Sequence, residues 1–167
     1  MPLKNINQPP IIKIDTNLRL IVLDKSDWIV ALKWYHNPKI LYYSEGITDE
    51  KTYDIDTINR MYEYLSNIGE LYFIEINENN KWVLIGDVTL SEKNMPIIIG
   101  DEYYWGKGIG YIVINTLINR AKVIGITKIN IPTIYSYNKR SQNLFKSIGF
   151  IELNTSNPNK SYVLNII

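Results

Sequence analysis

The first part of the chain alternates between a compact apolar run and longer segments with helical spacing. Residues 18–23 form the apolar run, which predicts a strand. Residues 28–35 and 48–65 carry apolar side chains every three to four positions, which predicts two helices. We expect Asn37-Pro38 to end the first helix and Gly69 to cap the second, because proline disfavours a preceding helical residue and glycine favours C-caps.

The rest of the chain shows the same alternation. Apolar and β-branched runs predict strands over 71–76, 82–90, 96–99, 128–135, 150–153 and 162–166, and helical spacing predicts helices over 110–121 and 141–148. The polar residues 77–80 predict a hairpin turn, Pro132 predicts a bulge, and Gly149 predicts a helix cap. This order of elements predicts an α/β fold, with an N-terminal arm over 1–17 and a single domain over 18–167.

Composition removes several classes of function. The 167 residues suffice for one domain with a sizeable core, and 18 basic against 17 acidic residues leave no net charge that would attract nucleic acid or an anionic membrane. The chain has no cysteine and a single histidine, His36, which excludes disulfides, thiolate chemistry and a multi-histidine metal site. Neither a membrane span nor a signal peptide is evident, so we expect a soluble, cytoplasmic protein.

The stretch Tyr104-Trp105-Gly106-Lys107-Gly108-Ile109-Gly110 carries the most chemical information. It lies between a predicted buried strand and a predicted helix N-terminus. Its three glycines permit positive φ and a close approach of a ligand to the backbone. The free N–H groups of a first helical turn would suit a pyrophosphate, and Lys107 would add a positive charge. A tight turn between strand and helix is the alternative interpretation.

Two common phosphate motifs do not fit this stretch. A P-loop requires G-x-x-x-x-G-K-[ST], which is absent from the sequence. The dinucleotide fingerprint G-x-G-x-x-G also fails, because the spacing here is G-x-G-x-G and the preceding strand is the fourth rather than the first.

The stretch resembles the acyl-CoA pyrophosphate loop of the GNAT superfamily of N-acetyltransferases, whose pattern is (Arg/Gln)-x-x-Gly-x-(Gly/Ala). Residues 105–110 match it, with Trp105 in place of the usual Arg or Gln. Such a Tyr-Trp-Gly-Lys-Gly run is often seen in the branch that acetylates ribosomal-protein N-termini. Residues 138–150 resemble a second family motif, Asn-x-x-(Ala/Ser)-x-x-Leu-(Tyr/Phe)-x-x-x-Gly-Phe. Because both motifs occur in order, the chain is identified as a member of this superfamily, nearest to that branch.

The resemblance implies a fold and a reaction. The fold is a mixed, mostly antiparallel sheet of six to seven strands, flanked by about four helices, whose fourth and fifth strands splay apart. The reaction is direct transfer of an acetyl group from acetyl-CoA to a primary amine in a ternary complex, without a metal. Binding of the acyl donor is implied for Ile99, Gly100, Asp101, Trp105, Gly106, Lys107, Gly108, Ile109, Gly110, Asn138 and Ser141.

The group that protonates the departing thiolate is less evident. Many members of the superfamily have a tyrosine at the position of Phe145, which has no proton to give. In the ribosomal-protein branch the serine at the position of Ser141 takes this role, and Tyr135 and Tyr137 are substitutes. Asn138 is expected to contact the donor through its amide. Helix capping is the alternative role for both Asn138 and Ser141.

A general base is needed as well, because an alkylamine of pKa about 10.4 is protonated at neutral pH. Glu45 and Asp87 are the main candidates: Glu45 lies in a segment that walls the acceptor site in the family, and an acid within a strand, such as Asp87, is unusual unless it faces a cleft. Asp101 and Glu102 flank the glycine stretch. Each of these acids is otherwise a solvated surface charge.

The acceptor stays open among a protein N-terminus, a polyamine, an aminoglycoside-type antibiotic and another small amine. A second hypothesis is a non-catalytic acyl-CoA-binding or regulatory module on the same fold, which Phe145 favours because it replaces a tyrosine. We expect a monomer or homodimer that binds neither nucleic acid nor membrane.

Overall fold

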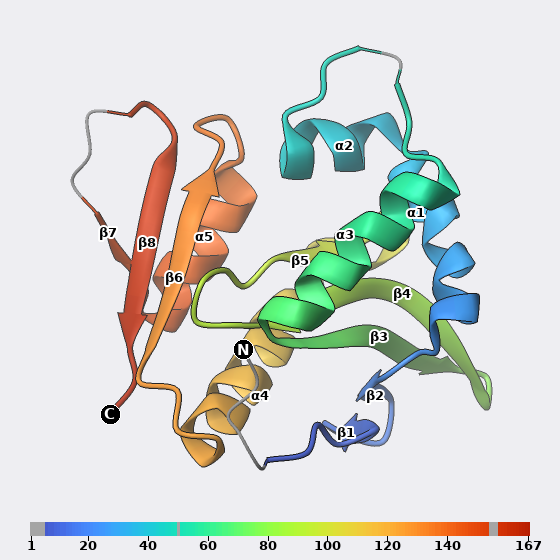
Figure 1. The fold of residues 1–167 in the computed structure, drawn as a ribbon, viewed down its shortest axis with the longest axis horizontal. Coiled ribbons are helices and arrows are strands. Elements are labelled where there is room, and N and C mark those ends of the chain that lie inside the picture. The colour runs from blue at the N-terminus through green and yellow to red at the C-terminus, as the bar shows by residue number, and fades with distance from the viewer. Residues whose placement is uncertain (1–5, 50, 154–156) are drawn as a thin grey trace.

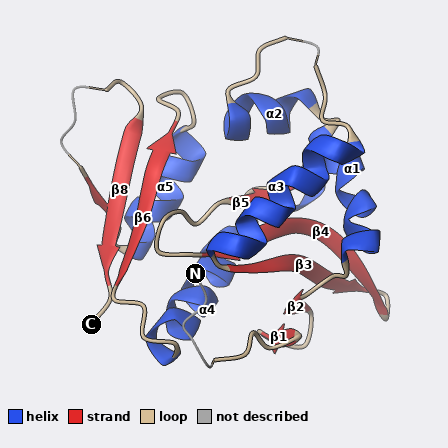
Figure 2. Cartoon of the chain, viewed as in Figure 1, coloured by secondary structure: helices blue, strands red, loops and turns tan. Residues whose placement is uncertain are grey.

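Two antiparallel sheets, with helices packed around them, make up the computed structural model, which describes residues 6–49, 51–153 and 157–167 (Figures 1 and 2). The larger sheet has the order β1-β2-β3-β4-β5, and the smaller has the order β6-β8-β7. The strands are β1 (Ile11–Lys13), β2 (Leu18–Ile21), β3 (Glu70–Glu78), β4 (Lys81–Leu90), β5 (Ile97–Ile99), β6 (Lys128–Ile134), β7 (Ile151–Glu152) and β8 (Lys160–Asn165). The helices are η1 (Lys25–Ala31), α1 (Leu32–Tyr35), α2 (Pro38–Glu45), α3 (Ile55–Ile68), η2 (Glu102–Tyr104), α4 (Ile109–Val123) and α5 (Lys139–Ile148), of which η1 and η2 are 3₁₀ helices.

The five-stranded sheet is covered on both faces. In β3, Tyr72 and Ile74 face the core that contains α4, whereas Leu71 and Phe73 face the core that contains η1, α1 and α3. This alternation follows from the period of two along a strand. The α4 core continues into the second sheet and α5 through residues such as Phe145. One core therefore joins the two sheets.

The gap between β5 and β6 is the feature that positions the site. β5 is the last strand of one sheet and β6 the first strand of the other, so these consecutive strands diverge instead of forming one continuous sheet. The bulge predicted at Pro132 is confirmed by a register shift between Ile131 and Ile134 in β6. The predicted hairpin between β3 and β4 is confirmed too, and Asn79 and Asn80 adopt the positive φ of a primed turn.

The predicted α/β architecture is confirmed, but the number and grouping of its elements differ. The described residues contain eight strands in two sheets and five α-helices, whereas the sequence predicted one sheet of six to seven strands and about four helices. The additional strand is β1, which pairs with β2 and lies within the segment 1–17 that was expected to be an arm. Residues 1–5 of that segment lie outside the described residues.

The segment between residues 24 and 69 departs most from prediction. The helix predicted over 28–35 is divided into the 3₁₀ helix η1 and the short helix α1, and the helix predicted over 48–65 begins only at Ile55, after the N-cap Asp54. The predicted end of the first helix before Asn37-Pro38 is confirmed, since α1 ends at Tyr35. The helix α2 was missed, because the same two residues are its N-cap and first residue. Gly69 has extended backbone, and a Cβ there would lie 2.1 Å from the carbonyl oxygen of Leu90. Close packing therefore accounts for Gly69, not a left-handed cap.

Candidate active site

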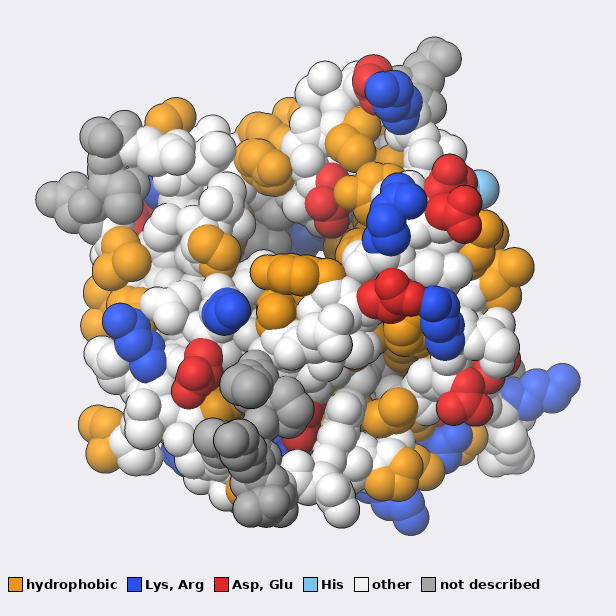
Figure 3. Space-filling model, in the orientation of Figure 1, with side chains coloured by type: hydrophobic (Ala, Val, Ile, Leu, Met, Phe, Trp, Pro, Cys, Tyr) orange, Lys and Arg blue, Asp and Glu red, His pale blue; other side chains and the backbone are white. Residues whose placement is uncertain are grey.

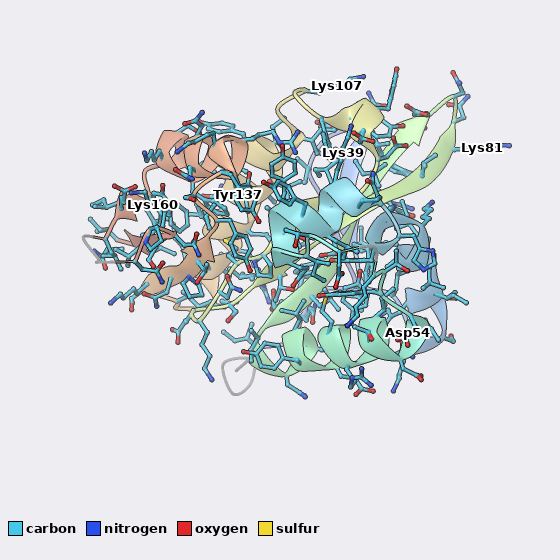
Figure 4. All side chains as sticks on the ribbon, turned by 90° about the horizontal axis from the view of Figure 1, so that it is seen from above. Lys39, Asp54, Lys81, Lys107, Tyr137 and Lys160 are labelled. Atoms are coloured by element: carbon cyan, nitrogen blue, oxygen red, sulfur yellow. The ribbon has the colours of Figure 1, made fainter. Side chains whose placement is uncertain are left out.

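Two cavities open on either side of β5. The first has a volume of about 270 Å³ and is lined by the loop 104–111, by β5, by α2 and by the start of α5. Its charged lining residues among the described part of the chain are Lys39, Lys107 and Arg140, so we call it the basic cavity. Figure 4 shows Lys39 and Lys107 on the same side of the molecule.

The second cavity has a volume of about 280 Å³ and carries the opposite charge. Its charged lining residues, again among those described, are Glu45 and Asp87, so we call it the acidic cavity. Hydrophobic side chains gather near the centre of the face drawn in Figure 3, between the β6–β8 half of the chain and α3. Tyr43, Ser44, Asn138 and Ser141 line both cavities, together with Ile97 and Ile98 of β5. The cavities therefore meet at β5 and the N-terminus of α5.

The glycine stretch forms a cradle at the N-terminus of α4. Gly106 and Gly108 have φ of +72° and +78°, and a Cβ built on either would meet no atom within 4 Å. The positive φ explains why these positions are glycine, and the empty space shows that a group could approach their backbone. Gly108 is the N-cap of α4, whose first N–H groups have no intrahelical acceptors. Gly110 serves packing instead, since its Cβ would lie 3.2 Å from Leu144.

The three cations of the basic cavity are held in different ways. The Lys107 ammonium lies 3.6 Å from the ring centre of Tyr103, and the Arg140 guanidinium lies 3.9 Å from the ring of Trp105. Lys39 forms a 2.7 Å ion pair with Glu102, which lowers the pKa of that carboxyl. Because cation–π contacts leave the charge uncompensated, Lys107 and Arg140 offer more positive charge to a ligand than Lys39.

The backbone of β5 presents an edge to the gap. The Gly100 N–H donates to Ile85 of β4 at 2.7 Å, and the Pro96 carbonyl accepts from Thr89 at 3.1 Å. Backbone groups alternate in direction along an antiparallel ladder, so those of Ile97 and Ile99 point away from β4. The Trp105 indole N–H confirms this direction by donating to the Ile99 carbonyl at 2.7 Å. The N–H of Ile99 faces the same way.

Asp87 is a buried carboxylate in the middle of β4. It is only 1% exposed, and its Oδ2 accepts hydrogen bonds from Tyr62 at 2.7 Å and from Tyr35 at 3.0 Å. Burial raises its pKa to about 7, and the nearby charge of Glu45 acts in the same direction, whereas the two tyrosine hydroxyls oppose the shift. Burial therefore shifts the pKa of Asp87 into the range that a general base at neutral pH requires.

Glu45 is the second carboxyl group of the acidic cavity. It is the last residue of α2, which ends at Gly46 in a left-handed conformation. Burial raises the pKa of Glu45, while a hydrogen bond with Tyr53 opposes the shift. Glu45 and Asp87 are 42 residues apart in sequence, yet both line the acidic cavity and both have a raised pKa.

The N-terminus of α5 holds Ser141 between the two cavities. Asn138 caps the helix, since its Oδ1 accepts from the Ser141 N–H at 3.2 Å, and its Nδ2 donates to the Tyr43 carbonyl at 3.2 Å. The Ser141 hydroxyl has no hydrogen-bond partner among the described residues. The capping role considered for both residues thus belongs to Asn138, and the Ser141 hydroxyl is available to a ligand.

A model of the acetyltransferase (GNAT) family matches residues 33–150. The chain belongs to the GNAT family. A curated relative of this GNAT chain, an uncharacterized protein of Methanocaldococcus jannaschii, is 34% identical over 84 residues, which are 47% of this chain and 17% of the relative. The match thus spans about one sixth of that relative's length.

Two solved structures share the fold of this GNAT chain at low sequence identity. Spermidine N-acetyltransferase from Vibrio cholerae, in complex with CoA and spermine, superimposes with a TM-score of 0.71 at 19% identity, covering 91% of this chain and 97% of that one. An acetyltransferase from Salmonella typhimurium that modifies the N-terminal serine of ribosomal protein L7/L12 has a TM-score of 0.72 at 15% identity, covering 94% and 99%. The predicted family is confirmed. No helix in the described residues has the length and hydrophobicity needed to cross a membrane.

The GNAT motifs predicted a set of site residues, most of which lie around one cavity. The structure brings residues 105–110, Ile99, Asn138 and Ser141 together around the basic cavity. Gly100 and Asp101 are not among the residues that line it: Gly100 packs against Trp34, and Asp101 caps η2. Binding of the acyl donor by these two residues stays a prediction.

Tyr137 and Phe145 also have clear positions. The Tyr137 ring stacks on Tyr42 at a centroid distance of 4.2 Å, and its hydroxyl donates to the Tyr42 carbonyl at 2.7 Å. Tyr137 lies between α5 and α2 in Figure 4, and it is not among the residues lining either cavity. Phe145 lines the acidic cavity and stacks edge-on against Phe150, so it supplies apolar wall.

Four functional candidates were missed from the sequence of this GNAT chain. They are Lys39 and Arg140 in the basic cavity, and Tyr35 and Tyr62 around Asp87. Arg140 follows directly after the motif residues Asn138 and Lys139, so its position was a usable signal. The two tyrosines gave no signal, because they reach Asp87 from helices 52 and 25 residues away in sequence.

Proposed function

We propose that this chain is an acetyl-CoA-dependent N-acetyltransferase that moves the acetyl group directly to a primary amine in a ternary complex. The observation that carries the proposal is the pair of cavities of opposite charge that meet at β5 and Ser141. A basic cavity suits a phosphate-bearing acyl donor, and an acidic cavity suits an ammonium group. The acyl carbon and the amine would then meet where the cavities join.

The glycine cradle would bind the pyrophosphate of acetyl-CoA. The backbone of Gly106 and Gly108 is open to a ligand, and the N-terminus of α4 favours negative charge. Lys107 and Arg140 would add charge from the cavity wall. The pantetheine arm would then run along the free edge of β5, where the Ile99 N–H points away from β4 and would polarise the acyl carbonyl.

A carboxylate of the acidic cavity would accept the proton of the acceptor amine. Deprotonating an alkylamine at neutral pH costs roughly 4 kcal/mol, so a nearby base accelerates the reaction. Asp87 has a pKa of about 7, which matches a general base at neutral pH. Tyr35 and Tyr62 hold its carboxylate in place, and Glu45 adds a second negative charge that attracts the ammonium.

Ser141 would supply a proton to the departing thiolate. Its hydroxyl borders both cavities, has no partner in the described structure, and lies at the N-terminus of α5, which favours a developing negative charge. Phe145 cannot replace it. This arrangement favours an enzyme over a module that only binds acyl-CoA, since a binder has no need of an uncommitted hydroxyl at the junction.

The test is release of free thiol from acetyl-CoA in the presence of a panel of primary amines and N-terminal peptides, together with calorimetry of CoA binding. We expect CoA to bind and at least one amine to release thiol. CoA binding without thiol release on any amine would favour the non-catalytic module. Absence of CoA binding at millimolar ligand would contradict both.

A further inference from the structure

The walls of the acidic cavity carry information about the acceptor. Within the described residues, Glu45 and Asp87 are its only charged lining groups, and neither lysine, arginine nor histidine lines it. Arg140 of α5 lines the basic cavity instead, with its guanidinium 3.9 Å from the Trp105 ring and 5.9 Å from the Tyr43 ring. A carboxylate or phosphate brought into the acidic cavity would therefore meet negative charge and no cation, which disfavours its binding.

Most of the remaining wall is apolar and aromatic, and its uncharged polar residues are Ser44, Asn94, Thr133, Asn138 and Ser141. Met61 and Leu65 of α3, Met95, and Ile131 and Phe145 on the opposite side all line the cavity. Tyrosine rings lie at several points of the same wall, Tyr35 and Tyr135 among them. Such walls favour a flat or bulky apolar body over a chain that carries several charges, because each further ammonium would need its own partner.

The charge available for the acceptor is small. Glu45 and Asp87 can together carry at most two negative charges, and burial raises the pKa of both, which favours their neutral forms. The hydroxyls of Tyr35 and Tyr62 already donate to Oδ2 of Asp87, so fewer carboxylate oxygens are left to accept from a ligand. The cavity therefore suits a ligand with one ammonium group better than a ligand with several.

We propose that the acceptor is a monoamine with an apolar, ring-sized body and no carboxylate or phosphate beside its amine, an inference that rests on the proposed function. In the reaction, the amine nitrogen bonds to the acetyl carbon as the carbon–sulfur bond breaks. The ammonium first loses a proton to a carboxylate of the cavity, which frees the amine to attack. The second amine proton replaces the one that the Ser141 hydroxyl gives to the departing thiolate, so Ser141 ends the reaction as a hydroxyl.

A matched set of indole compounds tests this inference. Tryptamine, tryptophan, tryptophanamide and the peptide Trp-Gly-Gly keep the same ring and amine and differ only in the group beside the amine. We expect kcat/KM for tryptamine to exceed that for tryptophan by at least about 100-fold, because tryptophan brings an unpaired carboxylate into the cavity. Tryptophanamide shows whether the cavity accepts a neutral amide beside the amine. Trp-Gly-Gly shows whether it also accepts a peptide N-terminus or only a small amine. Spermidine is the multiply charged comparison and should be the weaker substrate.

Binding separates failure of this inference from failure of the proposed function. Calorimetry of the CoA-loaded protein should show tryptamine binding at least about tenfold more tightly than tryptophan, whether or not thiol is released. If no amine is acetylated but this preference holds, the proposed function fails, and only the preference of the cavity for a monoamine ligand without a carboxylate stands. Equal binding or equal turnover of the two compounds, no binding of either, or a preference for spermidine overturns the inference.

A charge substitution provides a second, independent test. Thr133 is exposed and lines the acidic cavity, so Thr133→Lys adds a cation without disturbing the core. The variant should shift the tryptamine-to-tryptophan ratio toward tryptophan by about tenfold or more, since the new ammonium pairs with the carboxylate. The control Thr127→Lys places the same charge at an exposed residue that lines neither cavity and should leave the ratio unchanged. An unchanged ratio in the folded Thr133 variant also overturns the inference.

Discussion

The basic and acidic cavities share Ser141 and Asn138 but are built on different principles. The basic cavity depends on backbone: two left-handed glycines, a helix N-terminus and the edge of β5. The acidic cavity depends on side chains that tertiary packing has removed from water, above all Asp87. A backbone site at a helix N-terminus favours phosphate-bearing ligands in general. A site made of buried carboxyl groups instead sets the pKa of those groups. Changes in the two cavities should therefore have different signatures.

The largest effect is expected from Gly108→Val in the basic cavity. A side chain at φ +78° is strained and fills the space that a phosphate would occupy, so the Kd for CoA should rise by on the order of 100-fold or more. Calorimetry gives the Kd. Gly125→Val is the matched control, because Gly125 has φ +79° but lies outside both cavities. If both variants lose stability equally and both keep normal CoA affinity, the stretch is only a turn.

Ser141→Ala probes the junction of the cavities and should reduce kcat by on the order of 100-fold, with little change in the KM for acetyl-CoA. The melting temperature should barely move, because the cap of α5 is the Asn138 side chain rather than the Ser141 hydroxyl. Steady-state kinetics on an amine from the panel measures this. Ser147→Ala, on the same helix but with its hydroxyl bound to the Leu144 carbonyl, should leave kcat unchanged. Normal turnover of the Ser141 variant would shift the search to Tyr135 or a water molecule.

Asp87→Asn tests the acidic cavity through pH. The pKa of Asp87 is about 7 in the fold against an ordinary value of 3.8, so the folded chain holds more protons between these pH values. Stability should then fall as pH rises from about 4 to 7, by at most about 4 kcal/mol from this group. The Asn variant should have a flatter dependence of melting temperature on pH between 4 and 8.

The same substitution should reduce kcat/KM for the amine, since the amide oxygen accepts hydrogen bonds from Tyr35 and Tyr62 but cannot take a proton. Asp27→Asn, at an exposed position, is the control for both measurements. A variant that keeps the wild-type pH profile of stability and rate would assign the proton to Glu45, whose pKa is also raised.

The contrast between the cavities also explains how much the sequence revealed. The glycine stretch, the Asn138 cap and the β3–β4 hairpin are local in sequence, so spacing and turn chemistry predicted them. Helix α2 was missed because Asn37-Pro38 has two readings: proline disfavours helix before itself and favours the first turn of a helix after it. Both hold here, since α1 ends at Tyr35 and α2 begins at Pro38, and the prediction used only the first.

The acidic cavity lies at the other extreme. Sequence pattern marked Asp87 as unusual in a strand, but it could not show the tyrosines that hold it or the burial that raises its pKa. These depend on α1 and α3 packing over one face of the sheet. Likewise, the sequence could not show that Gly100 packs against Trp34 or that the Tyr137 hydroxyl donates to the Tyr42 carbonyl.

The smallest expected effect concerns the cations of the basic cavity, where backbone contributes most of the binding. Arg140→Gln should raise the Kd for CoA by about three- to tenfold, because one exposed charge near a phosphate contributes of the order of 1 kcal/mol. Arg140→Lys keeps the charge but loses the planar contact with Trp105, so it should recover only part of that loss. Lys39→Gln should have less effect than Arg140→Gln, since Lys39 is already paired with Glu102 at 2.7 Å. Calorimetry at low and high salt measures all three variants.

Two outcomes would change this ranking of the cations. Equal losses of CoA affinity in Lys39→Gln and Arg140→Gln would mean that charge alone matters. A loss for Arg140→Lys as large as for Arg140→Gln would mean that the stacked guanidinium, rather than its charge, holds the ligand.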